Sequence, residues 1–414
     1  MPPMVSSPPP GRRERVLSGM RPTGKLHLGN YHGALRNWVA LQAGYDGFFF
    51  VADWHALTTD YEHTGPLQQH VHEIVVDWLA AGLDPERAAI FLQSDVVGHA
   101  ELHLLLSMIT PLSWLERVPT YKDQQAQLKE KDLATYGFLG YPLLQSADIL
   151  IYRPAWVPVG EDQVAHVEIT REIARRFNHI FGRDAQFAAR VKAALSKFGP
   201  ARTQYLALRR GFQENGDAAA LAEARGIVAA AASLDEGERE LLRANLEGEV
   251  HRLLPAPEVL LTPTPKVPGL DGRKMSKSYG NTIGLTEDPA SIEKKIRGMT
   301  TDPARVRRND PGNPDKCPVW DLHRLYSSEE TQAWVRAGCT TAGIGCIECK
   351  KPVWEKVCAQ ATVMRERAAP YLNNPGRVRE ILAHGAQQAN EAAEATMQVV
   401  RRAMNLVPPA TAVE

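Results

Sequence analysis

Between about Arg15 and Gly182, short apolar runs alternate with stretches of helical periodicity, and this alternation constrains the fold more than any other feature. Short apolar runs bounded by polar segments favour buried strands, and amphipathic stretches favour helices. Strands that alternate with helices form βαβ units, so we expect a Rossmann-like, doubly wound α/β fold with a parallel sheet. The predicted strands are Val16–Met20, Phe48–Asp53 and Ala89–Gln93, and the predicted helices are Tyr31–Leu41, Leu67–Leu79 and Leu102–Met108.

Two segments follow predicted strands and therefore lie where such sheets bind ligands, at the carboxyl ends of the strands. They are Ser18–Asn30 and Asp53–His55. Ser18–Asn30 passes through a glycine-containing turn and opens a helix near Leu28, and amides at a helix start suit phosphate groups. Turns of this kind also occur for geometric reasons alone. The segment matches neither the glycine spacing of the dinucleotide fingerprint nor a Walker loop.

The remainder of the chain changes character at three places. The block 183–256 is rich in Ala, Arg, Glu and Leu and predicts an inserted segment of two or three helices, whereas Pro257–Asn281 is rich in loops. Asp288 followed by Pro289 predicts a helix start, and a long helix is expected over Val378–Ala403. The predicted organisation is a disordered leader (1–14), a catalytic domain (15–182 and 257–285), the inserted segment (183–256) and a C-terminal α-helical domain (286–414).

The 414 residues contain 48 Lys and Arg against 48 Asp and Glu. This balance argues against a protein that coats nucleic acid indiscriminately, because such binding neutralises many phosphates. It leaves room for a local basic face, which Arg305, Arg307 and Arg308 suggest. Because no apolar run is long enough to span a bilayer and the N-terminus lacks the apolar core of a secretory signal, we expect a cytoplasmic protein without membrane contact.

The loop Lys274–Ser278 places Lys274 and Lys277 close together, with Ser276 and Ser278 beside them. Two ammonium groups in such a loop can meet the charge that develops on a polyphosphate in a transition state. By composition alone, a solvated basic loop is the competing interpretation.

Taken together, His27–Asn30 and Lys274–Ser278 resemble the two signature motifs of the class I aminoacyl-tRNA synthetases. The tyrosyl-tRNA synthetases share this plan but differ over Gly160–Gln163. The resemblance covers about Val16 to Leu406 except for 183–256. Further segments are similar to the tryptophanyl-tRNA synthetases: Gly29–Leu35, Tyr141–Pro142, Ser146–Ile149 and Val157–Gln163.

The resemblance implies an ATP site and a tryptophan site. Tyr141, Gln145 and Asp148 have the spacing of one helix face, and Asp148 matches the acidic residue that accepts the indole N–H. Asn30 stands where the first signature usually has His, Arg21 where Gln is expected and Gln145 where Met is expected. The implied catalytic residues are Lys274, Lys277 and Asn30. The implied ATP-binding residues are Arg21, Pro22, Thr23, Gly29, Asn30, Gly160, Glu161, Asp162, Val267, Lys274, Met275, Ser276, Lys277 and Ser278, and the implied tryptophan-binding residues are Asp148, Tyr141, Gln145, Gln163 and His55.

The implied activity is tryptophan–tRNA ligation. Tryptophan would react with ATP and Mg²⁺ to give the adenylate and pyrophosphate, and would then pass to tRNA(Trp), which the C-terminal domain would recognise by its anticodon. A homodimer is implied by the resemblance alone. Three alternatives are a non-catalytic paralogue that binds tryptophan or RNA, a tyrosyl-tRNA synthetase, and a nucleotidyltransferase for a small cofactor.

Four of the five cysteines, Cys317, Cys339, Cys346 and Cys349, fall in one stretch. Four thiolates can hold a zinc ion or a [4Fe–4S] cluster, and the spacing does not choose between them. The stretch resembles the cluster-binding spacing of some bacterial tryptophanyl-tRNA synthetases, which favours a [4Fe–4S] cluster. Zinc is the second expectation and unliganded thiols are the third.

Overall fold

The computed structural model describes residues 13–119, 121, 134–160, 163–182, 187–215, 217–246, 253–261, 265 and 267–407, without the side chains of 213–215. The predicted leader lies outside these ranges except for its last two residues. The chain divides into two compact units. The first unit comprises Met1–Val97, Trp156–Val164 and Val259–Asn390, and the second comprises Gly98–Ala155, Ala165–Glu258 and Glu391–Glu414.

Five strands form one sheet in the order β3-β2-β1-β4-β5. The β1–β2, β2–β3 and β1–β4 pairs are parallel, which confirms the expected parallel, Rossmann-like sheet. The short strand β5 falls in a segment that the sequence predicted to be loop, and β2 ends two residues before Asp53, which begins a helix instead. The bounds are β1 Arg15–Met20, β2 Asp46–Val51, β3 Ala88–Leu92, β4 Trp156–Val159 and β5 Glu258–Leu261.

The central strands are buried on both faces. On β2, the successive side chains Phe48, Phe49 and Phe50 point to opposite faces and are 5%, 0% and 5% exposed. A parallel sheet covered on both sides requires such continuous apolar runs. This explains why the strands were recognisable in the sequence without an alternating pattern.

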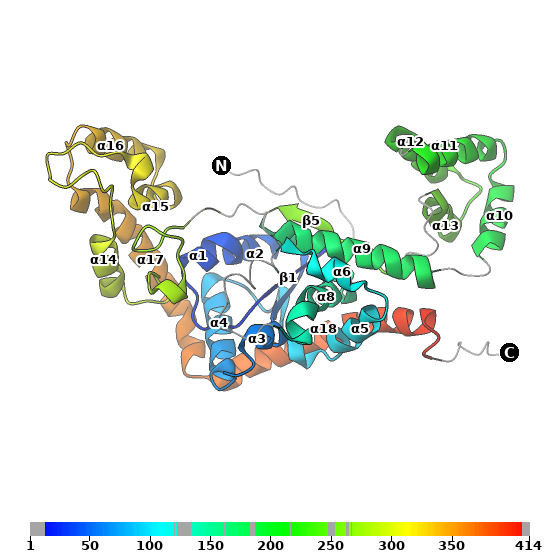
Figure 1. Ribbon diagram of the computed structural model, residues 1–414, viewed down its shortest axis with the longest axis horizontal. Coiled ribbons are helices and arrows are strands. Elements are labelled where there is room, and N and C mark those ends of the chain that lie inside the picture. Colours follow the sequence, from blue (N-terminus) through cyan, green and yellow to red (C-terminus); the bar gives the residue numbers. More distant parts are fainter. Residues whose placement is uncertain are drawn as a thin grey trace. The chain divides into compact units, whose positions relative to one another are not determined.

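Helices of the first unit pack around one shared core. The contacts of α4 with α17, and of α14, α15 and α16 with α17, hold this unit together (Figure 1). The helical elements are α1 Leu28–Asn30, the π-helical turn η1 Tyr31–Leu35, α2 Arg36–Leu41, α3 Asp53–Asp60, α4 Leu67–Ala81, η2 Gln93–Asp95, η4 Lys277–Tyr279, α14 Pro289–Gly298, η5 Pro314–Lys316, α15 Pro318–Tyr326, α16 Glu329–Thr340, α17 Cys346–Leu372 and the first part of α18 Pro375–Ala403.

Two local features of these helices follow directly from sequence. The Asp288 carboxylate accepts hydrogen bonds from the Ala290 and Ser291 amides with Pro289 at the first position, so the predicted start of α14 is confirmed. On α18, Gly385 lies against β3, because an added Cβ would stand 2.0 Å from the carbonyl oxygen of Ile90. Only a glycine allows the helix to approach the strand this closely.

In the second unit, the described residues form helices, the loops between them and the start of β5. The helices α10–α13 enclose their own core around the fully buried Tyr205, whose hydroxyl donates to the Leu242 carbonyl at 2.7 Å (Figure 1). The described part of 183–256 therefore contains four helices, more than the two or three predicted. The helices are α5 Gly98–Ser107, α6 Leu112–Glu116, α8 Tyr136–Ile151, most of α9 Val164–Phe181, α10 Phe187–Lys197, α11 Ala201–Asn215, α12 Ala218–Ala230, α13 Glu236–Leu246 and the end of α18.

None of the helices in the described ranges is long and apolar enough to cross a membrane.

A buried histidine in η1 predicts a pH dependence of stability. Burial lowers the pKa of His32 from 6.5 to about 4, with a smaller contribution from Arg36. The folded state binds this proton less readily than the unfolded chain does. The contribution of the neutral His32 to the unfolding free energy is therefore complete above pH 6.5 and is lost as the pH falls toward 4. The His32→Phe variant keeps a ring edge-on to Tyr31 and Tyr326. Between pH 6.5 and 4, we expect the unfolding free energy of the wild type to fall by about 3 kcal/mol more than that of this variant.

Urea unfolding at the two ends of this pH range measures the difference. The exposed His63→Phe is the matched control for the loss of a histidine. Equal pH dependence in the wild type and in His32→Phe would contradict the prediction.

Candidate functional site

The strand order places two predicted binding segments at the same edge of the sheet. The order reverses between β1 and β4, and ligands of open α/β sheets bind at such a reversal, beyond the carboxyl ends of the strands. The segment 21–30 follows β1, and 160–163 follows β4. Because β1 and β4 are parallel neighbours, both segments leave the sheet at this edge.

The segment after β1 is folded by its own side chains. Gly24 has a φ of +88°, a conformation that favours glycine, and the turn it makes leads into α1. At the start of α1, the Gly29 amide donates to His27 Nδ1 at 3.1 Å, and the His27 amide donates to the Asn30 side-chain oxygen at 3.2 Å. Burial, and secondarily Lys277, lowers the pKa of His27 to about 4, so the ring is neutral and can accept. His27 thus caps the helix that was predicted to open near Leu28.

The loop 274–278 is organised around Asn281, whose side chain is 3% exposed. Its amide group donates to Asp271 at 2.7 Å, and its oxygen accepts from the Ser276 amide at 2.8 Å. The Met275 amide donates to the Val267 carbonyl at 3.2 Å, and both of these side chains are buried. The two predicted lysines project from this scaffold, and both are exposed.

The late loop meets the first segment directly. Lys277 Nζ donates to the carbonyl oxygens of Thr23 at 2.7 Å and of Gly24 at 2.9 Å. Behind this contact, the Leu28 amide donates to the Ile283 carbonyl at 3.0 Å, and the segments pair again at Leu285. Two stretches about 250 residues apart, Lys277 and Thr23 being separated by 254 positions, are therefore brought together.

The ammonium group of Lys277 is hydrogen-bonded only to uncharged oxygen atoms, those of Thr23 and Gly24, among the described residues. Loss of hydration lowers its pKa below the ordinary value, while the more distant carboxylates of Asp77 and Glu73 raise it. Backbone carbonyls bind an ammonium group less strongly than a phosphate does, since charge-assisted bonds between ions are the stronger class. A polyphosphate at this sheet edge can therefore draw Lys277 away from Thr23 and Gly24.

Asp77, on α4, bonds to residues next to both motif segments and was not identified from the sequence. Its carboxylate is 2% exposed and accepts from the Leu26 amide at 2.6 Å and from the Thr286 hydroxyl at 3.4 Å. Burial raises its pKa from 3.8 to about 6. The only sequence signal was a carboxylate on the apolar face of a helix, which indicates a buried polar contact and does not identify the partner.

Replacing Asp77 with alanine is expected to lower the unfolding free energy by about 1–3 kcal/mol, because the buried Leu26 amide then has no acceptor. The Asp77→Asn variant keeps an acceptor and should be less affected. Because ionising the buried acid is costly, wild-type stability falls as the pH rises from 3.8 to about 6, and the Asn variant should lack this fall.

Urea unfolding of the three proteins over this pH range is the measurement, with the exposed Glu86→Ala as control. An alanine variant as stable as the wild type would show that Asp77 does not support this segment.

In the second unit, the predicted helix carrying Tyr141, Gln145 and Asp148 is confirmed as α8. Asp148 is 1% exposed, and its Oδ1 lies 2.5 Å from Nδ1 of His99 on α5. The Tyr141 ring is buried against the His166 ring, with centroids 5.7 Å apart. A carboxylate and an aromatic ring on one helix face form a surface that can accept an N–H group and stack on a flat ring.

The other predicted site residues belong to the first unit. His55 lies in α3 and is partly buried, Gln163 follows the end of β4 with its amide bonded to the Gly160 carbonyl at 3.0 Å, and Arg21 donates to the Thr59 hydroxyl. Pro22 is buried. Glu161 and Asp162 lie outside the described residues.

The four clustered cysteines stand on three converging elements, and all are free thiols. Cys317 precedes α15, Cys339 lies in the last turn of α16, and Cys346 and Cys349 occupy the first turn of α17. Burial, and secondarily the other three thiols, raise the pKa of Cys349 to about 12. Even so, no three His, Cys, Asp or Glu side chains within the described ranges are placed to hold a metal ion, so the structure gives no support to the predicted metal site.

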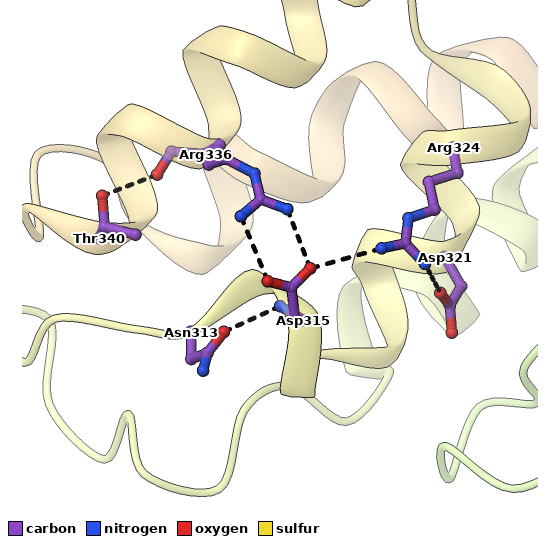
Figure 2. A network of polar contacts seen from close by, with 6 residues as sticks. All are labelled: Asn313, Asp315, Asp321, Arg324, Arg336 and Thr340. Atoms are coloured by element: carbon purple, nitrogen blue, oxygen red, sulfur yellow. Dashed lines mark hydrogen bonds and ion pairs between the residues drawn. The ribbon is translucent and has the colours of Figure 1, made fainter.

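A network centred on Asp315 ties these elements together (Figure 2). Its two carboxylate oxygens accept from Arg336 on α16 at 2.9 and 3.2 Å, and one of them also accepts from Arg324 on α15 at 3.4 Å. Arg324 in turn contacts Asp321 at 3.1 Å. The Arg336 guanidinium holds the pKa of Asp315 below its usual range. The bidentate bond joins η5 to α16 and so fixes the loop that leads to Cys317.

A surface pocket of about 350 Å³ lies at the start of α17, lined by residues 305–308 and 345–348. Arg305 is buried and donates to the carbonyls of Arg308 and Ile344, whereas Arg307 and Arg308 are exposed. Of the three arginines that suggested a basic face, two are therefore exposed, and one of these, Arg308, also forms an ion pair with Glu348 at 3.3 Å.

Comparisons with known proteins agree with this geometry. Residues 10–198 and 237–359 match the family described as tRNA synthetases class I (W and Y), and the unmatched 199–236 lies within the predicted insertion. The chain is 59% identical over 394 residues to the tryptophan–tRNA ligase of Ralstonia nicotianae, covering 95% of this chain and 98% of that protein. It is 45% identical over 395 residues to the tryptophan–tRNA ligase of Thermotoga maritima, covering 95% and 99%. Among solved structures, it resembles tryptophanyl-tRNA synthetase from Campylobacter jejuni complexed with ADP and tryptophan, with a TM-score of 0.69, 29% identity and coverage of 94% and 99%.

Proposed function

The chain belongs to the class I tRNA synthetases of the tryptophan and tyrosine family, and we propose on this premise that it is the enzyme that ligates tryptophan to tRNA(Trp). The observation that carries the proposal is the contact of Lys277 Nζ with the Thr23 and Gly24 carbonyls. This contact brings a cationic loop against the helix-opening segment at the reversal of the sheet. An enzyme that handles ATP needs both elements at one place, whereas a binding module for tryptophan does not need the lysines.

The reaction has two steps. The tryptophan carboxylate attacks the α-phosphorus of ATP, supplied as its Mg²⁺ complex, and the bond from this phosphorus to pyrophosphate breaks. A hydroxyl at the tRNA 3′ end then attacks the carbonyl carbon of the adenylate, and AMP leaves. Negative charge grows on the departing pyrophosphate, and Lys274 and Lys277 would stabilise it. Positioning and electrostatics suffice, so no protein nucleophile is needed.

For the ATP site, we propose a surface formed by the two motif segments and the turn after β4. Support comes from the strand order and from the pairing of Leu26 and Leu28 with residues 283–285. The proposed contacts are Arg21, Pro22, Thr23, Gly29, Asn30, Gly160, Glu161, Asp162, Val267, Lys274, Met275, Ser276, Lys277 and Ser278. The catalytic members are Lys274, Lys277 and Asn30.

For tryptophan, we propose that Asp148 accepts the indole N–H, with Tyr141, Gln145, Gln163 and His55 also in contact with the amino acid. The support is the burial of Asp148 and its place on one face of α8 with Tyr141. A buried acceptor beside the ring favours substrates that bring a donor, because a ring without an N–H gains no hydrogen bond from it.

Pyrophosphate exchange into ATP tests the proposed function. We expect exchange that depends on L-tryptophan, no comparable exchange with L-tyrosine, and charging of tRNA(Trp). Exchange with tyrosine alone would identify a tyrosyl enzyme. Binding of tryptophan by calorimetry without any exchange would identify the non-catalytic paralogue, and exchange that depends on a small cofactor instead of an amino acid would identify the nucleotidyltransferase.

For tRNA, we propose that the helical region 286–414 recognises the anticodon and that the pocket at the start of α17 contributes positive charge. Changing both Arg307 and Arg308 to alanine should weaken tRNA binding and reduce the slope of log affinity against log salt by about 2, while leaving pyrophosphate exchange unchanged. Filter binding over a salt series measures the slope. The exposed Arg87→Ala, which lies outside this region, is the control, and a double variant with the wild-type slope would contradict this role.

A [4Fe–4S] cluster on Cys317, Cys339, Cys346 and Cys349 stays a prediction from the sequence, with zinc as the alternative. It rests on the spacing of the four cysteines in the sequence and on the chemistry of thiolates, which are the usual ligands of both groups. Iron and acid-labile sulfide in protein purified without oxygen would support the cluster. Stoichiometric zinc in colourless protein, or no metal at all, would exclude it.

We also propose that the enzyme is a homodimer and acts in the cytoplasm, where translation takes place. Light scattering after size-exclusion chromatography tests the first point.

A further inference from the structure

Three polar side chains form a chain of hydrogen bonds inside the second unit. His99, Asp148 and Tyr152 are 0%, 1% and 0% exposed. Nδ1 of His99 lies 2.5 Å from Oδ1 of Asp148, and Nε2 lies 2.7 Å from the Tyr152 hydroxyl. Buried polar groups at this depth are retained only when they are hydrogen-bonded, and here the imidazole uses both of its nitrogen atoms.

The helices that carry these residues explain the arrangement. Asp148 lies on α8 and Tyr152 at its C-cap, four positions apart and hence on one face of the helix. His99 lies in the first turn of α5, which packs against α8, and its ring meets the Tyr152 ring with centroids 5.3 Å apart. The His99 imidazole thus lies between the Asp148 carboxylate and the Tyr152 hydroxyl, which are on the same face of α8.

The bonding pattern sets the role of one ring nitrogen. An ionised carboxylate can only accept, so Nδ1–H donates to Asp148, while Nε2 is bonded to the Tyr152 hydroxyl, which can either donate or accept. The imidazole fixes the rotation of the carboxylate through one of its oxygens. Because a carboxylate has about four lone-pair sites, this bond leaves it able to accept from a substrate as well.

We propose that His99, oriented by Tyr152, is a positioning residue that holds Asp148 as an acceptor and so makes the enzyme select amino acids whose ring carries an N–H donor. The inference rests on the proposed function, in which Asp148 meets the indole N–H. Without the imidazole, the carboxylate can rotate or take up a proton. A protonated carboxyl group can itself donate, so it no longer discriminates between a ring that carries an N–H and a ring that does not.

The test compares L-tryptophan with β-(benzothiophen-3-yl)-L-alanine, in which sulfur replaces the ring N–H. We expect His99→Leu to lower kcat/KM for tryptophan in pyrophosphate exchange by about tenfold or more, mainly through KM, because a hydrogen bond to a charged group is lost. The KM for ATP and the kcat/KM for the analogue should change little. The preference for tryptophan over the analogue should therefore fall by the same factor.

Two further variants separate positioning from folding. His99→Asn retains an N–H near the place of Nδ1 and should recover most of the preference, and Tyr152→Phe should reduce it less than His99→Leu does. If all three variants lower the activity on both amino acids equally, His99 has only a structural role and the inference is wrong. If the wild type shows no tryptophan-dependent exchange, the proposed function fails, whereas an active wild type with an unchanged preference in His99→Leu overturns this inference alone.

Discussion

Replacing Lys277 with alanine is expected to lower kcat for tryptophan-dependent pyrophosphate exchange by about 10²–10³-fold, with a much smaller change in the KM for tryptophan. In the free enzyme the ammonium group donates to the carbonyls of Thr23 and Gly24 and to the Thr23 hydroxyl, all of them uncharged acceptors. Its bond to a phosphate becomes strongest when charge develops on the departing pyrophosphate. Loss of an interaction made mainly in the transition state lowers kcat.

The structure supplies a control for this experiment. Lys294 is an exposed lysine on α14, and its alanine variant should exchange pyrophosphate at the wild-type rate. Because the Lys277 contacts in the free enzyme are at the surface, Lys277→Ala should also keep the wild-type thermal midpoint. A wild-type rate of exchange in folded Lys277→Ala would refute the role of this lysine.

The second large effect is expected for Asp148→Asn, which should lower kcat/KM for tryptophan by about 10²-fold or more. The amide has one acceptor oxygen. If that oxygen serves the Nδ1–H of His99, the amide NH₂ group faces the substrate N–H, and two donors oppose one another. The shape of the side chain is preserved, so the loss reports on hydrogen bonding and not on packing.

Pyrophosphate exchange with varied tryptophan, and separately with varied ATP, provides the measurement. The KM for ATP should stay within about twofold of the wild type, since Asp148 has no proposed contact with the nucleotide. A variant with unchanged kcat/KM for tryptophan would contradict the assignment. A variant that loses affinity for both substrates equally would indicate that Asp148 only stabilises the fold.

Elements with strong local signals were predicted correctly from the sequence. The apolar runs that became β2 and β3 are buried on both faces, as are Val16 and Leu17 of β1, and Asp288 with Pro289 begins α14 as expected. Predictions failed where the local sequence signal was weak or fitted more than one kind of secondary structure. The strand β5 arises in a proline-rich segment because it finds a place at the sheet edge beside β4, and the alanine-rich block folds into four helices whose boundaries depend on the core around Tyr205.

The candidate site divides in the same way. The two motifs were found because they consist of contiguous residues. Asp77 and His99 were missed because each acts on a group far away in the sequence, the Leu26 amide 51 positions from Asp77 and the Asp148 carboxylate 49 positions from His99. Nothing in the neighbouring residues specifies such a partner.

The sequence by itself determined the parallel α/β architecture, the family and the two segments that carry the chemistry, since all of these follow from short-range patterns of burial, capping and motif spacing. The tertiary structure alone decided that Lys277 rests on Thr23 and Gly24, and that Asp148 is held by an imidazole from another helix. For the four cysteines that fall in one stretch of the chain, the described residues show no group placed to hold a metal ion, so the structure adds no support to the predicted site. Such pairings depend on how separate elements pack, and packing is set by the whole core and not by any one segment.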